Sequence, residues 1–267
     1  MNANQQHFTE TFSITWGDQA ENHHGMQRLG KLAAEGFTCQ DFRDLEIPGK
    51  EIIDLTQFLP ESVRVKDDYE ASLLVIRNGV DLLLGERERE GEGEGMKDKL
   101  FKEIKELPVD KKGLMRGRVV HKLARWNNCF ADEAQEPDYT SGKGTVIAFK
   151  DVPFTNQFRQ ALPTMFGEKA RNLLAETNHY YDLNKCGIGF HGDSERKIVI
   201  CARFGASMSM EFQWFQQSRA VGTRFHTEFH HGDLYVMSEK ATGHDWKKRK
   251  VHTLRHAAGS DKFLKIN

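Results

Sequence analysis

The stretch Asn178–Glu195, NHYYDLNKCGIGFHGDSE, contains the pattern on which the interpretation of the whole chain depends. Its apolar run Cys186–His191 ends in His191, and Asp193 follows after one glycine. Side chains two residues apart on a β-strand share a face, so this imidazole and this carboxylate can bind one ion from the same side. With a distant second histidine they would form the ligand set of non-haem Fe(II) oxygenases. The pattern predicts a metal site at the end of a strand.

The sequence after this stretch has the pattern of a β-rich core. Lys197–Phe204, KIVICARF, is rich in β-branched residues and contains no turn former, which is typical of a buried strand. Further runs of this kind, separated by glycines, are Met208–Phe215, Arg224–His230, Asp233–Ser238, Val251–Ala257 and Lys262–Ile266. Short strands at this spacing predict an α+β protein whose core is a jelly roll, also called a double-stranded β-helix.

In the preceding sequence, the apolar runs Ile52–Leu55 and Leu73–Ile76 indicate strands or short buried elements, and the other segments are expected to be helical or irregular. We predict an N-terminal extension over residues 1–110, with a mobile charged loop at 85–95, and a catalytic domain over 111–267. Apolar residues at helical spacing predict one helix over Met96–Leu107 and a second over Asn156–Thr177, which should break at Pro163.

Net charge and the pattern of apolar residues indicate where the protein is expected to be found and what it is expected to bind. The 267 residues carry a formal net charge of −1, which does not favour a dedicated nucleic-acid binder, although Lys247–Lys250 is a local basic run. No apolar stretch is long enough for a membrane helix, and residues 1–12 lack the pattern of a secretory signal. We expect an intracellular protein, cytoplasmic or nuclear, with no membrane partner.

Three motifs together resemble the AlkB-like family of Fe(II)- and 2-oxoglutarate-dependent dioxygenases. Asn178 and Tyr180 precede a glycine-rich strand that ends in His-x-Asp, and Ile198–Phe204 and the later segment HGDLYVM (231–237) resemble the next core strands. The similarity covers roughly residues 115–267 and is greatest to members from large DNA viruses and algae. It implies Fe(II), 2-oxoglutarate and O2 as cofactors, with ascorbate as a reductant in vitro, and it implies that Asn178 and Tyr180 bind 2-oxoglutarate.

The third metal ligand has three candidates downstream: His244, His252 and His256. We favour His256, because the small residues Ala257 and Ala258 beside it leave room for an ion, and because the resemblance points to the same residue.

The resemblance also implies a cation that holds the far carboxylate of 2-oxoglutarate. If His256 is the ligand, Lys262 or Lys265 is the candidate, and Lys262 is our choice. If His244 is the ligand, Arg255 has the better spacing.

The substrate follows from the resemblance alone. In the family, a lid covers the substrate, and Arg125, Trp126 and Tyr139 are the corresponding candidates here. Methylated DNA or RNA is the implied partner, and the implied reaction is hydroxylation or oxidative demethylation of a base. Two alternatives stay open: the same chemistry on a protein or small molecule, and a non-enzymatic module that binds nucleic acid or protein.

Overall fold

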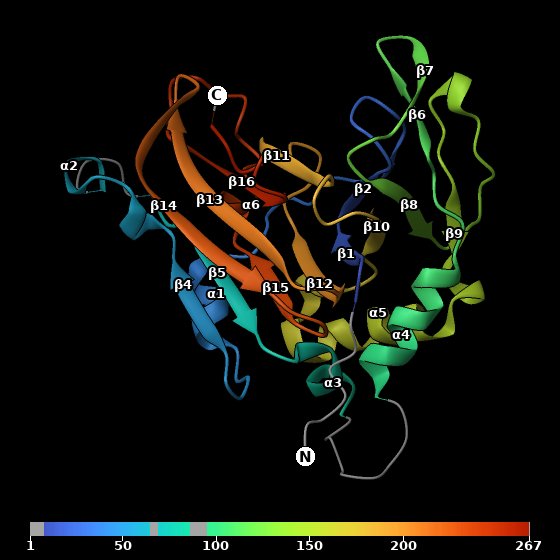
Figure 1. Cartoon of the computed structure of the whole chain (residues 1–267). Coiled ribbons are helices and arrows are strands. Elements are labelled where there is room, and N and C mark those ends of the chain that lie inside the picture. Colours follow the sequence, from blue (N-terminus) through green and yellow to red (C-terminus); the bar gives the residue numbers. More distant parts are fainter. Residues whose placement is uncertain (1–7, 65–68, 86–94, 267) are drawn as a thin grey trace.

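Two β-sheets face each other in a computed structural model that describes residues 8–64, 69–85 and 95–266 (Figure 1). The larger sheet has eight strands, in the order β4 (Glu51–Asp54), β5 (Ser72–Ile76), β15 (Leu234–Met237), β12 (Val199–Gly205), β1 (Thr11–Gly17), β10 (Leu174–Tyr180), β8 (Trp126–Ala131) and β9 (Val146–Ala148). The smaller sheet has the order β11 (Gly187–His191), β16 (Thr253–Gly259), β13 (Met208–Gln216) and β14 (Arg219–Phe229). The result is a sheet-rich α/β protein built around a β-sandwich.

Two short hairpins and several helices surround the sandwich. The hairpins are β2 (Gln19–Glu21) with β3 (Arg28–Gly30), and β6 (Lys112–Met115) with β7 (Arg118–His121). The helices are α1 (Cys39–Asp44), α2 (Glu61–Arg64), α3 (Gly79–Leu84), α4 (Met96–Glu106), α5 (Pro153–Phe166) and α6 (Glu239–Thr242). Short 3₁₀ turns occupy Thr56–Phe58, Tyr139–Ser141, Phe149–Asp151 and Glu168–Ala170.

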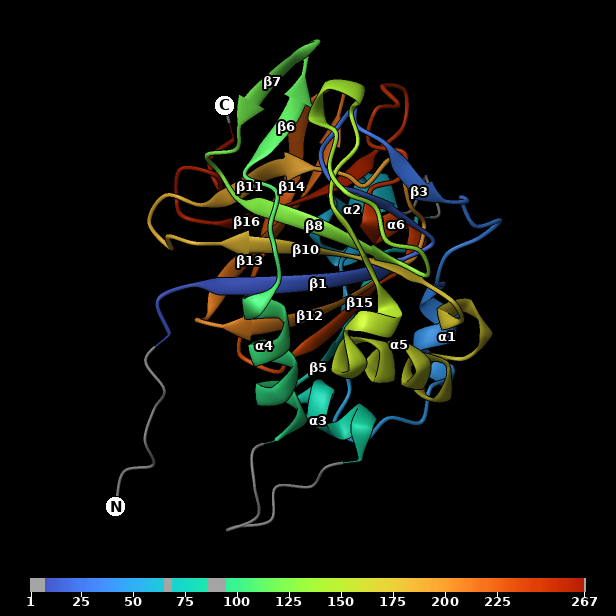
Figure 2. The ribbon, with the colours of Figure 1, turned by 90° about the vertical axis from the view of Figure 1, so that its right-hand side faces the viewer.

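From β10 onward the chain crosses between the two sheets at almost every connection. β10, β12 and β15 lie in the large sheet, and β11, β13, β14 and β16 lie in the small one. β1 lies between β10 and β12 and is antiparallel to both, as Figure 2 shows. The first strand of the chain therefore fills a central position between strands that occur much later in the sequence.

Two hydrophobic cores divide the molecule into three layers. One lies between the two sheets and includes Val199, Met210 and Trp214. The other lies between the large sheet and helices α3 to α5, where Trp16 packs on Phe158 at 4.6 Å between ring centroids. Alternate residues of β12 thus belong to different cores, whereas β1 adds Phe12, Ile14 and Trp16 to the helix-side core and lines a pocket between the sheets with Ser13 and Thr15.

Several predictions made from the sequence differ from the structure. Residues 1–110 are not an extension, because β1, β4 and β5 are integral strands of the large sheet. The helix expected over Asn156–Thr177 ends at Phe166 and contains Pro163 without a break, while residues 174–177 belong to β10. Residues 262–266 form turns and irregular chain instead of a strand.

Other predictions agree with the structure or lie outside it. The helix predicted over Met96–Leu107 is α4, which ends at Glu106. Most of the loop predicted at 85–95 lies outside the described residues. None of the helices in the described ranges is both long and apolar enough to cross a membrane.

Candidate metal centre

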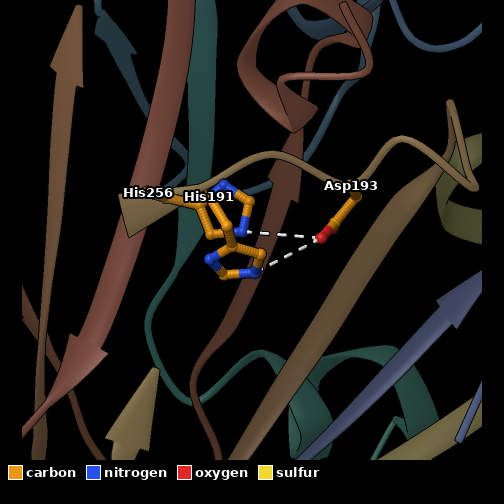
Figure 3. Close-up of side chains that lie close together, drawn as sticks. All are labelled: His191, Asp193 and His256. Atoms are coloured by element: carbon orange, nitrogen blue, oxygen red, sulfur yellow. Dashed lines mark ion pairs between the residues drawn. The ribbon is translucent and has the colours of Figure 1, made fainter. Parts of the chain in front are cut away.

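Three side chains from two neighbouring strands converge on one point (Figure 3). His191 ends β11, Asp193 follows it, and His256 lies opposite His191 on β16. The Oδ1 atom of Asp193 is 3.5 Å from Nε2 of His191 and 3.8 Å from Nε2 of His256. One ligand atom from each residue lies within 4.8 Å of the other two. Two imidazoles and a carboxylate in this arrangement fit the facial ligand set of a non-haem Fe(II) site.

Backbone contacts hold the two residues of the His-x-Asp motif in place. The carbonyl oxygen of Gly189 lies 2.9 Å from Nδ1 of His191, which leaves Nε2 to face the carboxylate. The N–H of Asp193 donates to the carbonyl of Thr242 at 2.9 Å. The orientation of both ligands is therefore fixed by hydrogen bonds outside the site itself.

Gly192, between His191 and Asp193, lies where close packing leaves no room for a side chain. A Cβ atom at this position would lie 2.2 Å from the carbonyl oxygen of Gly243 and 2.8 Å from Cβ of Trp246. The backbone of the turn after α6 thus presses directly on the motif, so glycine here permits the close approach of two chain segments.

Burial shifts the acid–base behaviour of two ligands in opposite directions. Burial raises the pKa of the Asp193 carboxyl, although nearby Arg196 and His191 oppose the shift. Burial lowers the pKa of His256 well below its usual value, and the positive charge of a protonated His191 would lower it further. A neutral imidazole is the form that binds a metal ion, so the position of His256 favours coordination over protonation.

The three ligands line a pocket of about 280 Å³ between the sheets. Arg203, on β12, lies in the same pocket and is buried. Its guanidinium carbon is 5.8 Å from the ring centre of Tyr180 and 5.9 Å from that of Tyr235. Among the described residues no carboxylate pairs with this guanidinium, and its Nε has no hydrogen-bond partner. A buried cation without a counter-charge is costly, so this position is suited to an anionic ligand.

Asn178 and Tyr180, predicted to bind a cosubstrate, both line the pocket. Oδ1 of Asn178 accepts hydrogen bonds from Nε of Arg125 and Nδ2 of Asn127, each at 2.6 Å. Arg125, predicted to lie in a lid, therefore joins the pocket wall through Asn178.

A charged cluster forms another wall of the pocket. Arg196 is fully buried, and its Nη2 donates to Glu176 at 2.7 Å and to Glu195 at 3.1 Å. Glu176 also accepts a hydrogen bond from the N–H of Glu21. The cluster ties the segment after Asp193 to β10 and places two carboxylates in the pocket lining.

The remaining candidates from the sequence lie elsewhere. The Trp126 ring stacks on Tyr181 at 4.0 Å, and the Tyr139 hydroxyl donates to Asp110 at 2.7 Å; neither lines the metal pocket. His244 lines a different hollow beside α6, and Lys262 lies on the outer face of the small sheet.

His252 and the two alternative cations are also separated from the metal ligands. His252 is buried, with its ring edge-on to Tyr69. Lys265 and Arg255 line the same outer hollow as Lys262. Of the three histidines that the sequence left open, His256 is the one that joins His191 and Asp193.

Sequence analysis missed Arg203, although a signal was present. Arg203 is the only charged residue within the apolar segment Ile198–Phe204. A charge inside a strand that is otherwise buried on both faces usually has a functional or pairing role, since burying it alone is costly.

Comparison with known proteins gives one informative match. No protein-family model matches the chain. It is similar to "Uncharacterized protein R156" of Acanthamoeba polyphaga mimivirus, at 45% identity over 263 residues, which covers 96% of this chain and 98% of that protein. The similarity thus extends over nearly the whole length of both chains.

Proposed function

We propose that this chain, which belongs to the same family as the mimivirus protein R156, is an Fe(II)- and 2-oxoglutarate-dependent dioxygenase of the AlkB-like kind. The observation that carries the proposal is one pocket that contains both His191, Asp193 and His256 and a buried arginine without a counter-charge. A metal site alone would suit many activities. Together with a deep anion-binding position it matches an enzyme that binds a dicarboxylate beside its metal.

The strand order supports a jelly-roll interpretation of the sandwich. The chain alternates between the sheets from β10 to β16, apart from the hairpin of β13 and β14. In this interpretation β1 takes the eighth position, between β10 and β12, which a C-terminal strand would otherwise fill. The eight strands would then form the core, and β4, β5, β8 and β9 would extend the large sheet.

The residues of the pocket have distinct roles in the proposed reaction. Arg203 binds the far carboxylate of 2-oxoglutarate, and Tyr180 and Tyr235 flank it and exclude water. His191, Asp193 and His256 would hold the iron, with His256 neutral at Nε2. Iron, 2-oxoglutarate and oxygen together supply the oxidation of a C–H bond, with release of succinate and CO2.

A methylated base in DNA or RNA is the proposed substrate. The pocket lining includes a hydrogen-bond donor, Arg125, and two acceptors, Glu176 and Glu195, and both kinds are needed to recognise the edge of a base. Hydroxylation of an N-methyl group there gives a product that releases formaldehyde, which amounts to demethylation.

The direct test is release of CO2 from labelled 2-oxoglutarate by the purified protein with Fe(II) and ascorbate. We expect slow release without substrate, and His191→Ala should abolish it. His24→Ala is the matched control, because the exposed His24 lies at the pocket rim away from the ligand cluster. No release by the wild-type protein, together with no retention of iron, would overturn the proposal and favour a binding module.

Pools of methylated DNA, RNA and peptides then test the substrate. We expect one component of the nucleic-acid pools to lose a methyl group, as detected by mass spectrometry. A modified peptide with unchanged nucleic acids would contradict the proposed substrate while leaving the proposed chemistry intact.

A further inference from the structure

The outer face of the small sheet, turned away from the metal, contains a second hollow of about 470 Å³. Arg255 and Phe190, which contribute to it, immediately precede His256 and His191 on their strands. Neighbouring residues on a strand face opposite ways, so the hollow and the metal centre lie back to back across one sheet. The lining consists chiefly of aromatic and cationic side chains: Phe190, Phe215, Arg255, Lys262, Phe263 and Lys265.

Arg255 is a partly buried cation of this surface that contacts two aromatic rings. Its guanidinium carbon lies 4.2 Å from the ring centre of Phe215 and 5.2 Å from that of Trp246. Its Nε atom is buried without a hydrogen-bond partner, and burial lowers its pKa with no opposing acidic group. The guanidinium is therefore held between two rings, partly desolvated and ready for an anion.

The rest of the hollow repeats this combination of positive charge and aromatic surface. Lys262 and Lys265 are exposed, and Nζ of Lys262 lies 5.0 Å from the ring centre of Phe263. Phe190 is half-buried, with the Arg224 guanidinium 5.2 Å from its centre. Within the part of the chain that the structure describes, the hollow is lined by no acidic side chain. Proteins that bind single-stranded nucleic acid without sequence preference combine two features: cationic side chains that contact the phosphates and aromatic rings on which the bases stack.

This surface is continuous with the mouth of the metal pocket. Trp246 touches Arg255 and also lines the metal pocket. The next residue, Lys247, donates to Oγ of Ser194 at 3.2 Å, and Ser194 lines that pocket as well. Trp246 therefore connects the hollow with the metal pocket, and the exposed basic run Lys247–Lys250 follows it directly in the chain.

We propose that single-stranded nucleic acid binds along a track formed by the aromatic–cationic hollow, Trp246 and Lys247–Lys250. Phosphates contact Arg255, Lys262 and Lys265, and an unpaired base stacks on Phe190 or Phe263. Binding itself needs no metal. That the track delivers the strand to the metal centre rests on the proposed function.

Fluorescence anisotropy with a labelled single-stranded oligodeoxythymidine tests the track on the full chain. The triple variant Arg255→Met, Lys262→Gln, Lys265→Gln should weaken binding roughly tenfold or more, and it should lower the slope of log affinity against log salt by about 2. The control removes three charges elsewhere, from the hairpin of β6 and β7, as Lys112→Gln, Arg116→Gln, Arg118→Gln. Equal weakening by both triple variants would overturn the proposal, since it would indicate non-specific attraction.

A second comparison separates nucleic acid from other polyanions. Phe190→Leu and, independently, Phe263→Leu should weaken oligonucleotide binding several-fold and leave inorganic polyphosphate binding unchanged, because polyphosphate has no base to stack. Circular dichroism confirms that each variant is folded. Equal effects on both probes, or tighter binding of an acidic peptide than of the oligonucleotide, would contradict a nucleic-acid track.

Two outcomes distinguish this inference from the proposed function. His191→Ala should bind the oligonucleotide like the wild-type protein. Retained binding without CO2 release by the wild-type protein would contradict the dioxygenase alone. CO2 release with unaltered binding by the Arg255 triple variant would contradict the track alone.

Discussion

The inner and outer faces of the small sheet use the same strands for different chemistry. On the inner face, His191 and His256 meet Asp193 in a narrow pocket closed by the large sheet. On the outer face, Phe190 and Arg255 lie on an open surface with lysines around them. Moving by one residue along either strand therefore takes a side chain from the pocket between the sheets to the outer surface, or the reverse. The comparison shows that the side of the strand on which a residue lies, more than its distance along the sequence, separates the candidate metal ligands from residues of the open outer surface.

The largest loss of stability should come from Gly192→Ala, which distorts the backbone between His191 and Asp193 without replacing either residue. The added Cβ would meet the carbonyl oxygen of Gly243 at 2.2 Å, and backbone cannot give way as a side chain can. We expect a loss of about 3 kcal/mol or more in the free energy of unfolding, together with loss of metal binding. Urea unfolding and metal titration measure the two effects.

Gly189→Ala is the control from the other side of His191. A Cβ at Gly189 would have its nearest neighbour at 3.8 Å, an ordinary contact, so this variant should remain close to wild-type stability. If Gly192→Ala is as stable as Gly189→Ala, the close packing of the motif against the turn is wrong.

Removal of one inner-face histidine should have the next largest effect. His256→Ala should lower the affinity for Mn²⁺, a redox-stable substitute for Fe(II), by at least about a hundredfold, because loss of even an outer-shell contact costs 10- to 100-fold. Calorimetric titration measures the affinity. His244→Ala removes a histidine from a neighbouring hollow and should bind Mn²⁺ normally. The reverse result would exchange the roles of these two histidines.

Arg203→Met tests the proposed anion position on β12 of the large sheet, in the same pocket as the inner-face histidines. The loss of charge-assisted hydrogen bonds should raise the 2-oxoglutarate concentration needed for half-maximal CO2 release by about tenfold to a hundredfold, with iron retention unchanged. Arg171→Met, at an exposed ion pair with Glu168, provides the control for arginine removal. Unchanged 2-oxoglutarate dependence would assign the anchor to another residue.

The smallest expected effect is a pH dependence of stability caused by Lys122, a buried lysine that contacts Asn22 and Asn127 of the pocket lining. Burial lowers the pKa of Lys122 to about 8 from 10.5, and its Nζ donates to Oδ1 of Asn22 and of Asn127. The unfolded chain keeps the higher pKa, so above pH 8 it binds more protons than the folded chain, and stability rises with pH in this window. Relative to Lys122→Met, the wild-type protein should gain about 1 kcal/mol between pH 8 and pH 9.

Urea unfolding at the two pH values measures that gain. Lys112→Met, which removes an exposed lysine from β6 of the hairpin that precedes Lys122, should follow the wild-type protein. A wild-type protein that loses stability relative to Lys122→Met as the pH rises would contradict the predicted sign.

Local sequence patterns predicted the part of the candidate site that lies on one strand and its turn. His191 and Asp193 are neighbours in the chain, so strand alternation alone places them together. His256 was favoured among three candidates for its small neighbours. The cation proposed to bind 2-oxoglutarate was harder to predict. Lys262 was chosen because a final strand was expected there, and residues 262–266 form no strand. Arg203 lies on β12, far in sequence from the position that the resemblance implied.

Non-local pairing explains the errors in the fold. Leu173 and Leu174 continue the helical spacing of α5, but Gly167 and Asn172 adopt positive φ angles and end the helical path. The following residues pair with β1 and β8 as β10, so tertiary contacts override the local pattern. Thr11–Gly17 has a strand-like composition, yet nothing near it in the sequence indicates a central position.

That central position of β1 has a consequence for synthesis on the ribosome. Thr15 and Cys201 lie side by side but are 186 residues apart in the chain, so β1 emerges long before either of its neighbours exists. The nascent chain must keep this strand unpaired until β10 and β12 have been made. Closure of the large sheet then becomes a late event that joins the start of the chain to β10 and β12, and removal of the first twenty residues would split the sheet in the middle instead of trimming its edge.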